Sequence, residues 1–287
     1  MKQVDVLVVG GSAAGLVAAL TGKSHYPDKK IMLIRKEETV VVPCGIPYIF
    51  GSLETSEENV IPDGKLDALG VELKVAEVTK IDPEQKQCLL EDGTKITYDK
   101  LVLAIGSNPV VPSWLKGADL ENVYTVPKNK VYLDRMLHEF QDKERIVVVG
   151  GGFIGVELSD ELRKRGKEVT VVELLPHVLN AVFDEELAIQ AEEVLIDRGV
   201  QVETGSGVQE LTGNGKVDGV VLQNGAVLTA DAVILAMGYR PNTTLAAEAG
   251  IPLNKLGFIR VDQYMRTETP DIFAVGDCAE KKDFFTR

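Results

Sequence analysis

The sequence predicts an α/β protein with two doubly wound domains of mainly parallel sheet, one inserted in the other. The first observation is a repeated pattern of apolar strand, glycine turn, helix and second apolar strand, near residue 4 and again near residue 146. The second is that short runs with turn residues, Asp92-Gly93 and Asn224-Gly225, follow each copy and indicate an antiparallel insertion.

Hydrophobic runs define the elements of the first copy. The run Val4–Val9 predicts a buried strand, a helix follows at about Ala13–His25, and Ile31–Ile34 is a second, parallel strand. The remaining elements of this copy are two insertion strands and one further apolar strand, at Val71–Val75, Gln87–Leu90 and Leu101–Ile105.

The second copy has the same order of elements. A strand at Ile146–Val149 leads into a helix at about Phe153–Arg165 and then a strand at Val169–Glu173. Alternating runs that we assign to its insertion follow around Val202, at Val217–Leu222 and at Ala232–Ala236.

Two proline-containing segments, Ser107–Pro112 and Tyr239–Asn242, are the predicted crossings between the domains. The strand Ile272–Val275 then returns to the first domain and closes its sheet. The predicted boundaries are 1–112 and 243–287 for the two parts of the first domain and 113–242 for the inserted domain.

Composition limits the classes of function. The 287 residues are 45% hydrophobic and 26% charged, which is ordinary for a globular protein. The net charge of -13 repels polyanions, so we expect no nucleic-acid partner. There is no apolar run of the roughly 20 residues that a membrane helix needs, and we expect a cytoplasmic protein. Three widely spaced cysteines predict neither a disulfide framework nor a metal site.

Both glycine turns have the composition of a diphosphate-binding loop. Small residues let the backbone approach a pyrophosphate, whose charge is met by amide N–H groups at the start of the following helix. A tight turn without a ligand is the alternative for each copy, and the presence of two copies favours nucleotide binding. The motif places are Gly10, Ser12 and Gly15 in the first turn and Gly150, Gly152 and Gly155 in the second.

An acidic residue at the end of the second strand is expected to bind the adenosine ribose. Glu173 has this place in the second copy and favours NADH, because a carboxylate repels the 2′-phosphate of NADPH. A solvated glutamate at a strand end is the alternative. The first copy has Arg35 there, so we expect its ribose contact from Glu37 or from the backbone.

Cys44 follows the ribose-binding strand of the first copy, between Pro43 and Pro47. A free cysteine is more often a buried structural thiol than a nucleophile. The two prolines and Gly45 stiffen this segment, which begins beside the first predicted nucleotide site, and this favours a reactive thiolate. Cys88 has the pattern of an inserted-sheet residue and is assigned no chemistry.

Six motifs in order resemble the single-cysteine branch of the pyridine nucleotide-disulphide oxidoreductases, which includes coenzyme A disulfide reductases, NADH oxidases, NADH peroxidases and sulfur reductases. The resemblance implies two Rossmann-like domains of the glutathione reductase type, an NAD(P)H domain inserted in an FAD domain. The motifs are residues 8–15, 44–48, 103–109, 150–157, 236–242 and 269–280.

The resemblance implies that FAD binds to the first domain. The Asp277 carboxylate would accept a hydrogen bond from a ribityl hydroxyl of the flavin, although a helix N-cap is the alternative role. The implied FAD residues are Gly10, Ser12, Ala13, Gly15, Glu37, Val78, Ala104, Gly106 and Asp277.

NADH, with NADPH as the alternative, is expected on the inserted domain. Phe153 stands where the family usually has a gating tyrosine, and Glu157 matches a glutamate near the nicotinamide, with a plain helix surface as the alternative. The implied residues are Gly150, Gly151, Gly152, Phe153, Ile154, Gly155, Glu157, Glu173 and Gly238.

The implied catalytic residue is Cys44, which would take electrons from the flavin as a sulfenate or a mixed disulfide after hydride transfer from NAD(P)H. The small-molecule substrate would be a coenzyme A disulfide, a persulfide, a polysulfide or oxygen. Peroxidases and water-forming oxidases of the branch carry a histidine where this chain has Ala13, which favours the sulfur substrates. Coenzyme A users tend to have a basic cluster on the first helix, where this chain has Lys23 and His25.

Family members continue well beyond the position of Glu280, into a domain that forms a homodimer. We therefore expect the chain to be truncated, with its own oligomeric state left open. Two other hypotheses are a reductase of a ferredoxin-type carrier, with Cys44 incidental, and a non-catalytic nucleotide-binding module.

Overall fold

A computed structural model describes residues 2–281, so the outer ends of the first and last predicted domain segments lie outside the described residues. The chain divides into two compact units. Unit 1 contains the residues up to 43, residues 60–108 and those from 240 onward, and unit 2 contains 44–59 and 109–239. The crossings lie close to the predicted boundaries, whereas residues 44–59, assigned from the sequence to the first domain, group with unit 2.

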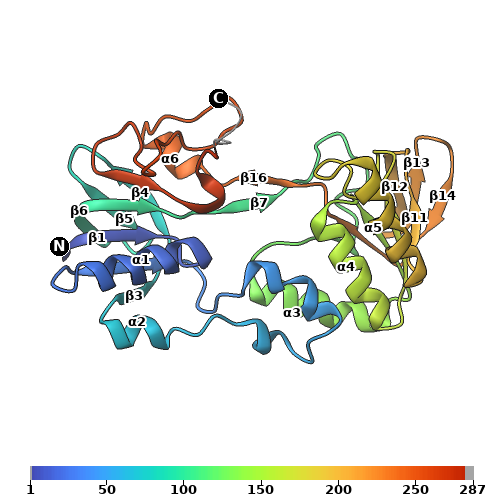
Figure 1. Ribbon diagram of the computed structural model, residues 1–287, viewed down its shortest axis with the longest axis horizontal. Helices are drawn as coiled ribbons and strands as arrows, with labels where there is room; N and C mark the ends of the chain where they lie inside the picture. The colour runs from blue at the N-terminus through green and yellow to red at the C-terminus, as the bar shows by residue number, and fades with distance from the viewer. Residues whose placement is uncertain (1, 282–287) are drawn as a thin grey trace. The chain divides into compact units, whose positions relative to one another are not determined.

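Unit 1 is built on a mixed sheet (Figure 1). Its elements are β1 (Lys2–Val9), α1 (Ala13–His25), β2 (Ile31–Arg35), α2 (Gly64–Leu69), β3 (Glu72–Val75), β4 (Val78–Asp82), β5 (Gln87–Leu90), β6 (Lys95–Leu103), α6 (Thr244–Glu248) and β17 (Ile272–Ala274). The strand order is β3-β2-β1-β6-β5-β4, with β17 paired to β6. The predicted return of the chain to the first domain by its last strand is confirmed.

Strand β6 joins the parallel and antiparallel parts of this sheet. Along one edge it pairs with β1, from Lys2↔Ile96 to Val9↔Leu103. Along the other edge its start pairs antiparallel with β5 and its end pairs parallel with β17. The apolar run predicted as a separate strand from Leu101 is therefore the end of this longer strand.

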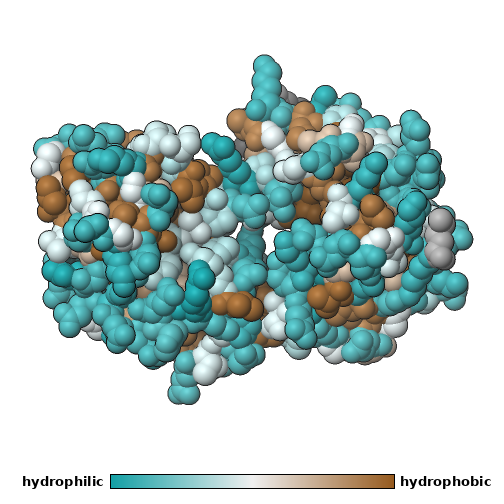
Figure 2. Space-filling view, turned by 180° about the vertical axis from the view of Figure 1, so that it is seen from behind, coloured by the Kyte–Doolittle hydropathy of each residue, from teal (hydrophilic) through white to brown (hydrophobic). Residues whose placement is uncertain are grey.

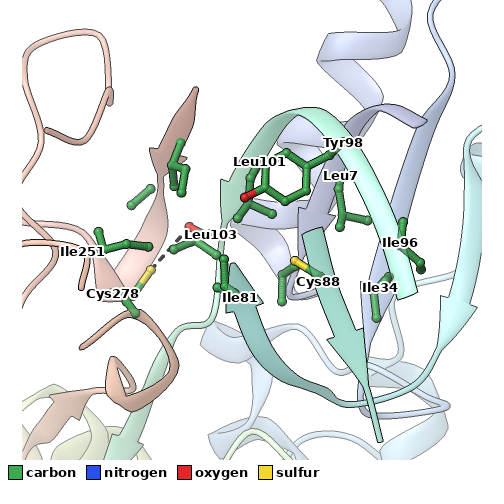
Figure 3. Close-up of a cluster of buried hydrophobic side chains, with 14 of the residues drawn as sticks. Leu7, Ile34, Ile81, Cys88, Ile96, Tyr98, Leu101, Leu103, Ile251 and Cys278 are labelled. Carbon is green, nitrogen blue, oxygen red and sulfur yellow. Dashed lines mark hydrogen bonds between the residues drawn. The ribbon is translucent and has the colours of Figure 1, made fainter. Parts of the chain in front are cut away.

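Alternation along the strands gives unit 1 a core on each face of the sheet. Val8 and Leu33 pack with Ala19 of α1 and Leu66 of α2. The next residues along these strands point to the opposite face, where they join β5, the 240–281 region and two buried cysteines, Cys88 and Cys278 (Figure 3). In Figure 1, α1 and α2 lie on one side of the sheet and α6 lies on the other.

Unit 2 contains a parallel sheet and a separate antiparallel one. Its elements are β8 (Val123–Thr125), α3 (Lys130–Glu139), β9 (Arg145–Val149), α4 (Phe153–Lys164), β10 (Glu168–Val172), α5 (Glu185–Asp197), β11 (Gln201–Glu203), β12 (Val208–Asn214), β13 (Lys216–Leu222), β14 (Val227–Thr229) and β15 (Ala232–Leu235). The parallel order is β11-β10-β9-β15-β8, and the antiparallel sheet is β12-β13-β14. The crossing strands β7 (Ser107–Pro109) and β16 (Tyr239–Pro241) pair with each other.

The predicted composition of the antiparallel insertions is wrong in three places. The runs at Val71–Val75 and around Val202 form β3 and β11, which extend the parallel sheets beyond β2 and β10. The run at Ala232–Ala236 forms β15, which is fully buried and parallel to its neighbours β9 and β8. The reason is that alternating apolar residues indicate a strand but not the direction of its partner.

The surface is mainly hydrophilic. On the face shown in Figure 2, hydrophobic residues are exposed in separate patches among polar and charged ones. None of the helices within residues 2–281 combines the length and the apolar character that crossing a bilayer requires.

Asp231 connects the starts of the two central strands of unit 2. Its carboxylate accepts hydrogen bonds from the backbone N–H of Arg145, at 2.9 Å, and from the Arg145 guanidinium, at 2.6 Å. The hydrogen bonds from Arg145 lower the pKa of Asp231 to about 2.

We expect Asp231→Asn to lower the free energy of unfolding of unit 2 by about 1–2 kcal/mol at neutral pH. Because the folded-state pKa of Asp231 is depressed, its stabilisation is present above pH about 4 and is lost as pH falls through about 2. Urea unfolding at pH 7 and at pH 2.5 or below, with the exposed Asp119→Asn as control, measures this. A difference from wild type that does not shrink on acidification would contradict it.

Candidate functional site

Close backbone contacts shape the first glycine turn. Gly10 has φ +105°, and a Cβ there would lie 2.1 Å from the carbonyl oxygen of Ala104. A Cβ on Gly15 would lie 1.8 Å from the carbonyl oxygen of Gly10. No side chain fits at either place, so α1 begins directly against the end of β1.

The second turn repeats this geometry in unit 2. Gly150 has φ +110° and faces the carbonyl oxygen of Ala236, at 2.4 Å from an added Cβ. A Cβ on Gly155 would lie 1.9 Å from the carbonyl oxygen of Gly150. Around Gly152 there is open space within 4 Å, which leaves room for a ligand against the backbone at the start of α4. The structure thus brings Gly150–Gly155 together as one cradle.

Ser12 tests whether the first turn fits a diphosphate. Its hydroxyl oxygen is buried and has no hydrogen-bond partner among the described residues. An orphaned buried donor is costly unless a ligand satisfies it. Its position directly before Ala13, the first residue of α1, is where a phosphate gains most from the helix N-terminus. The turn therefore fits a dinucleotide.

A cavity of about 460 Å³ opens beside this turn, within unit 1. Its size is within the range for small-molecule sites. Three predicted residues, Gly10, Glu37 and Val78, line it, and the carbonyl oxygen of Ala104 lies next to Gly10, 2.1 Å from where its Cβ would be. Lining residues that the sequence reasoning missed are Lys36, Thr79, Asn242, Thr244 and Glu248. The last three come from a segment far away in sequence. Asn242 ends the motif 236–242 but was assigned no contact, and no motif marks Thr244 or Glu248.

Arg35 has a structural role at the end of β2, where the second copy has an acidic residue. Its side chain is buried, and its guanidinium contacts both carboxylate oxygens of Asp63, at 2.6 and 2.7 Å. It also donates to the carbonyl oxygens of Glu37 and Glu38. Arg35 therefore orders the loop that brings Glu37 to the cavity.

Asp277 lies at the same end of the sheet as the first turn. It belongs to the 3₁₀ helix η5 (Gly276–Cys278), whose N-cap is Val275, so the helix N-cap alternative for Asp277 does not hold. Its carboxylate accepts a hydrogen bond from Ser107, at 2.8 Å. Gly276 packs against Ala14 of α1, where an added Cβ would lie 2.8 Å from the Ala14 Cβ. This places Asp277 close to the start of α1.

Glu173 is held against the second turn. One carboxylate oxygen accepts the N–H of Gly151, at 2.6 Å, and the other accepts the N–H of Leu175, at 2.8 Å. These two bonds fix the carboxylate at the mouth of the cradle, unlike a freely solvated strand-end glutamate. The remaining lone pairs can accept ribose hydroxyls.

The first two turns of α4 carry three of the other predicted residues, Phe153, Ile154 and Glu157. Phe153 is 51% exposed and makes an edge-to-face contact with Phe183, with ring centroids 5.7 Å apart. Partial burial, together with the nearby Glu161, raises the pKa of Glu157. Ile154 follows Phe153 in the first of these turns. Sequence reasoning missed Phe183, because an aromatic residue in a loop carries no motif.

The remaining predicted glycines lie at the crossings. Gly106 and Gly238 have φ +68° and +91°, and space around each is open within 4 Å. The carbonyl oxygen of Gly106 accepts the N–H of Asn242, and that of Gly238 accepts the N–H of Val110. Their ligand contacts stay a prediction.

Cys44 lies in the 3₁₀ helix η1 (Pro43–Gly45) and is exposed. The other two cysteines are buried, and burial raises the pKa of Cys88 to about 12 and also raises that of Cys278. By its contacts Cys44 belongs to unit 2, and its place beside the first nucleotide stays a prediction.

Known proteins resemble this chain over its whole length. A family model described as pyridine nucleotide-disulphide oxidoreductase matches residues 4–286. An NADH oxidase of Methanocaldococcus jannaschii is 34% identical over 98% of the chain, and an NAD(P)H sulfur oxidoreductase (CoA-dependent) of Pyrococcus abyssi is 33% identical over 98%. The chain spans 64% of each of these relatives. The crystal structure of reduced CoADR-RHD from Bacillus anthracis has a TM-score of 0.92 and 31% identity, covering 100% of this chain and 53% of its own.

We expect Ser12→Ala to weaken FAD binding about 5- to 30-fold, because it removes a buried donor worth about 1–2 kcal/mol. Fluorescence titration of the apoprotein with FAD measures the affinity. Ser24→Ala, an exposed change on the same helix, is the control. An unchanged FAD affinity in Ser12→Ala would show that the hydroxyl does not contact the diphosphate.

Glu173→Gln keeps an acceptor for the turn and removes the negative charge. We expect the preference for NADH over NADPH to fall about tenfold, because the repulsion of a 2′-phosphate and the charge-assisted bonds to ribose both weaken. Dissociation constants for the two nucleotides measure it, with Glu168→Gln at the exposed start of β10 as control. Equal losses for both nucleotides would contradict a role in discrimination.

Proposed function

Because the chain belongs to the pyridine nucleotide-disulphide oxidoreductase family, we propose that it binds FAD in unit 1 and NAD(P)H in unit 2 and reduces a small sulfur substrate through Cys44. The substrate class is a disulfide, persulfide or polysulfide, which includes coenzyme A derivatives. The observation that carries this proposal is the exposure of Cys44 in a chain whose other two cysteines are buried.

The residues of each cradle have separate roles. Ser12 and the amides at the start of α1 bind the FAD diphosphate, Glu37 lies at the cavity for its adenosine part, and Asp277 accepts a ribityl hydroxyl. In unit 2 the amides at the start of α4 bind the second diphosphate, and Glu173 accepts the ribose hydroxyls. When bound, FAD accepts a hydride from NAD(P)H and makes its two electrons available to sulfur.

Cys44 performs the sulfur chemistry. Its thiolate attacks one sulfur of a substrate disulfide, which releases the other sulfur as a thiolate and leaves a mixed disulfide on Cys44. Two electrons that originate from one NAD(P)H cleave this mixed disulfide, and the second substrate thiolate leaves as the Cys44 thiolate is restored. The sum is oxidation of one NAD(P)H and reduction of one disulfide to two thiols.

Ala13 supports a sulfur substrate over oxygen. It is exposed at the first position of α1, where it supplies no proton donor for peroxide or oxygen. The relative from Pyrococcus abyssi is named as a CoA-dependent sulfur oxidoreductase, and the one from Methanocaldococcus jannaschii as an NADH oxidase. Oxygen reduction is the second candidate activity of the same site.

We expect anaerobic titration of the FAD-loaded, oxidised protein to consume about two NADH per FAD, because FAD and oxidised Cys44 each accept two electrons. Cys44→Ser is expected to consume about one and to lose sulfur reduction. Cys88→Ala is the control, since that thiol is buried in β5. One NADH per FAD in all three proteins would contradict the cysteine mechanism and favour a carrier reductase, and failure to bind FAD would favour a nucleotide-binding module without turnover.

A further inference from the structure

The segment that carries Cys44, residues 44–59, is fastened to unit 2 by a buried carboxylate. Glu161, on the inner face of α4, is only 2% exposed. One of its carboxylate oxygens accepts the backbone N–H of Ser52 at 2.6 Å, and the other contacts the Lys164 ammonium at 2.6 Å. A buried carboxylate is costly unless both oxygens are satisfied, as they are here.

Gly51 allows this contact to be so close. A Cβ at Gly51 would lie 2.3 Å from a Glu161 carboxylate oxygen and 2.4 Å from the Glu161 backbone oxygen. The φ of Gly51 is -148°, outside the left-handed region, and the close packing against α4 leaves no room for a side chain there. Lys164 also reaches the Ser52 hydroxyl, at 3.3 Å.

Further contacts hold the rest of residues 44–59 on the same unit. The Phe50 ring packs against Phe140, with centroids 5.8 Å apart. Glu57 pairs with Lys130 of α3 at 2.6 Å, and because the Glu57 side chain is 70% exposed, this pair contributes little by itself. The Glu161 side chain is 2% exposed, compared with 12% for that of Lys130.

The connection from Ser52 back to Cys44 is short and ordered. The 3₁₀ helix η2 (Pro47–Phe50) follows η1, with Ile46 and Ile49 buried. The N–H of Ile49 bonds to the carbonyl of Ile46, and that of Leu53 bonds to the carbonyl of Tyr48. These hydrogen bonds and buried side chains order the backbone between Ser52 and Cys44.

We propose that Glu161 is a positioning residue for Cys44, which sets the place of the thiol by holding Ser52 on α4. This inference rests on the proposed function, because it assigns the purpose of the contact to Cys44 chemistry. Glu161 acts through the segment and has no direct contact with substrate. Since α4 also begins with the second glycine turn, one helix then carries both the nucleotide cradle and the anchor of the cysteine.

Three substitutions test the proposal in the FAD-loaded protein. Glu161→Ala removes the acceptor for Ser52, and Glu161→Gln restores an acceptor without the charge. Gly51→Ala leaves Glu161 intact and pushes the segment off α4. Glu193→Gln, at an exposed carboxylate on α5, is the control.

The measurements separate positioning from folding. Amide hydrogen exchange of residues 44–59 and the rate of Cys44 alkylation by iodoacetamide report on the segment itself, since Cys88 and Cys278 are buried. NADH-dependent reduction of ferricyanide needs both nucleotides but not Cys44, and reduction of an organic disulfide needs Cys44. We expect Glu161→Ala and Gly51→Ala to lose about tenfold or more in disulfide reduction, because small misplacement of a reacting group is costly.

The same two variants should show faster exchange at Ser52 and a changed alkylation rate, and keep ferricyanide reduction within about twofold. Glu161→Gln, which retains an acceptor for Ser52, should keep more disulfide reduction than Glu161→Ala. Unchanged exchange of residues 44–59 would overturn the anchor. Faster exchange with unchanged disulfide reduction, or a parallel loss of both activities, would overturn the positioning role. If Cys44→Ser keeps disulfide reduction, the proposed function is wrong, and the anchor is then judged by exchange and alkylation alone.

Discussion

The structure of both units depends on one backbone contact, in which the last glycine of the turn lies against the carbonyl oxygen of the first. This contact joins Gly15 to Gly10 and Gly155 to Gly150, at distances that leave no room for a side chain. It sets the start of each helix against the end of the first strand. The free backbone N–H groups at the starts of α1 and α4 therefore lie at the carboxyl ends of the parallel strands. The other residues of each candidate site lie around these N–H groups.

The two turns differ in the residue at the end of the second strand, which is Arg35 in unit 1 and Glu173 in unit 2. The Arg35 side chain lies beside Gly11, and the Glu173 side chain lies beside Gly151. Each is within about 3 Å of the position that a Cβ on that glycine would have. The Arg35 guanidinium pairs with the Asp63 carboxylate and orders the loop that brings Glu37 to the cavity. The Glu173 side chain accepts the N–H of Gly151, which places a carboxylate directly at the second glycine turn.

Sequence patterns predicted the helices after both turns and the strands around them, because these are fixed by residues close in sequence. The return of the chain to unit 1 followed from the order of the crossing segments and the last apolar strand, although its pairing with β6 is long-range. The patterns did not predict that β3 and β11 extend the parallel sheets, since alternation does not encode the direction of a partner strand. They also missed Phe183 and Glu248, which reach their sites from distant segments. The place of residues 44–59 was missed for the same reason, because its contacts are with α3 and α4.

The three cysteine thiols differ in their exposure to solvent, and this difference determines which of them is accessible to a substrate. A thiol must ionise to react, and burial without a compensating charge opposes ionisation, as the raised pKa values of Cys88 and Cys278 show. Two of the three cysteines are therefore inert fillers of the unit 1 core. Cys44 is exposed whereas its neighbours Ile46 and Ile49 are buried, so the segment gains its packing energy from those two residues while the thiol stays accessible.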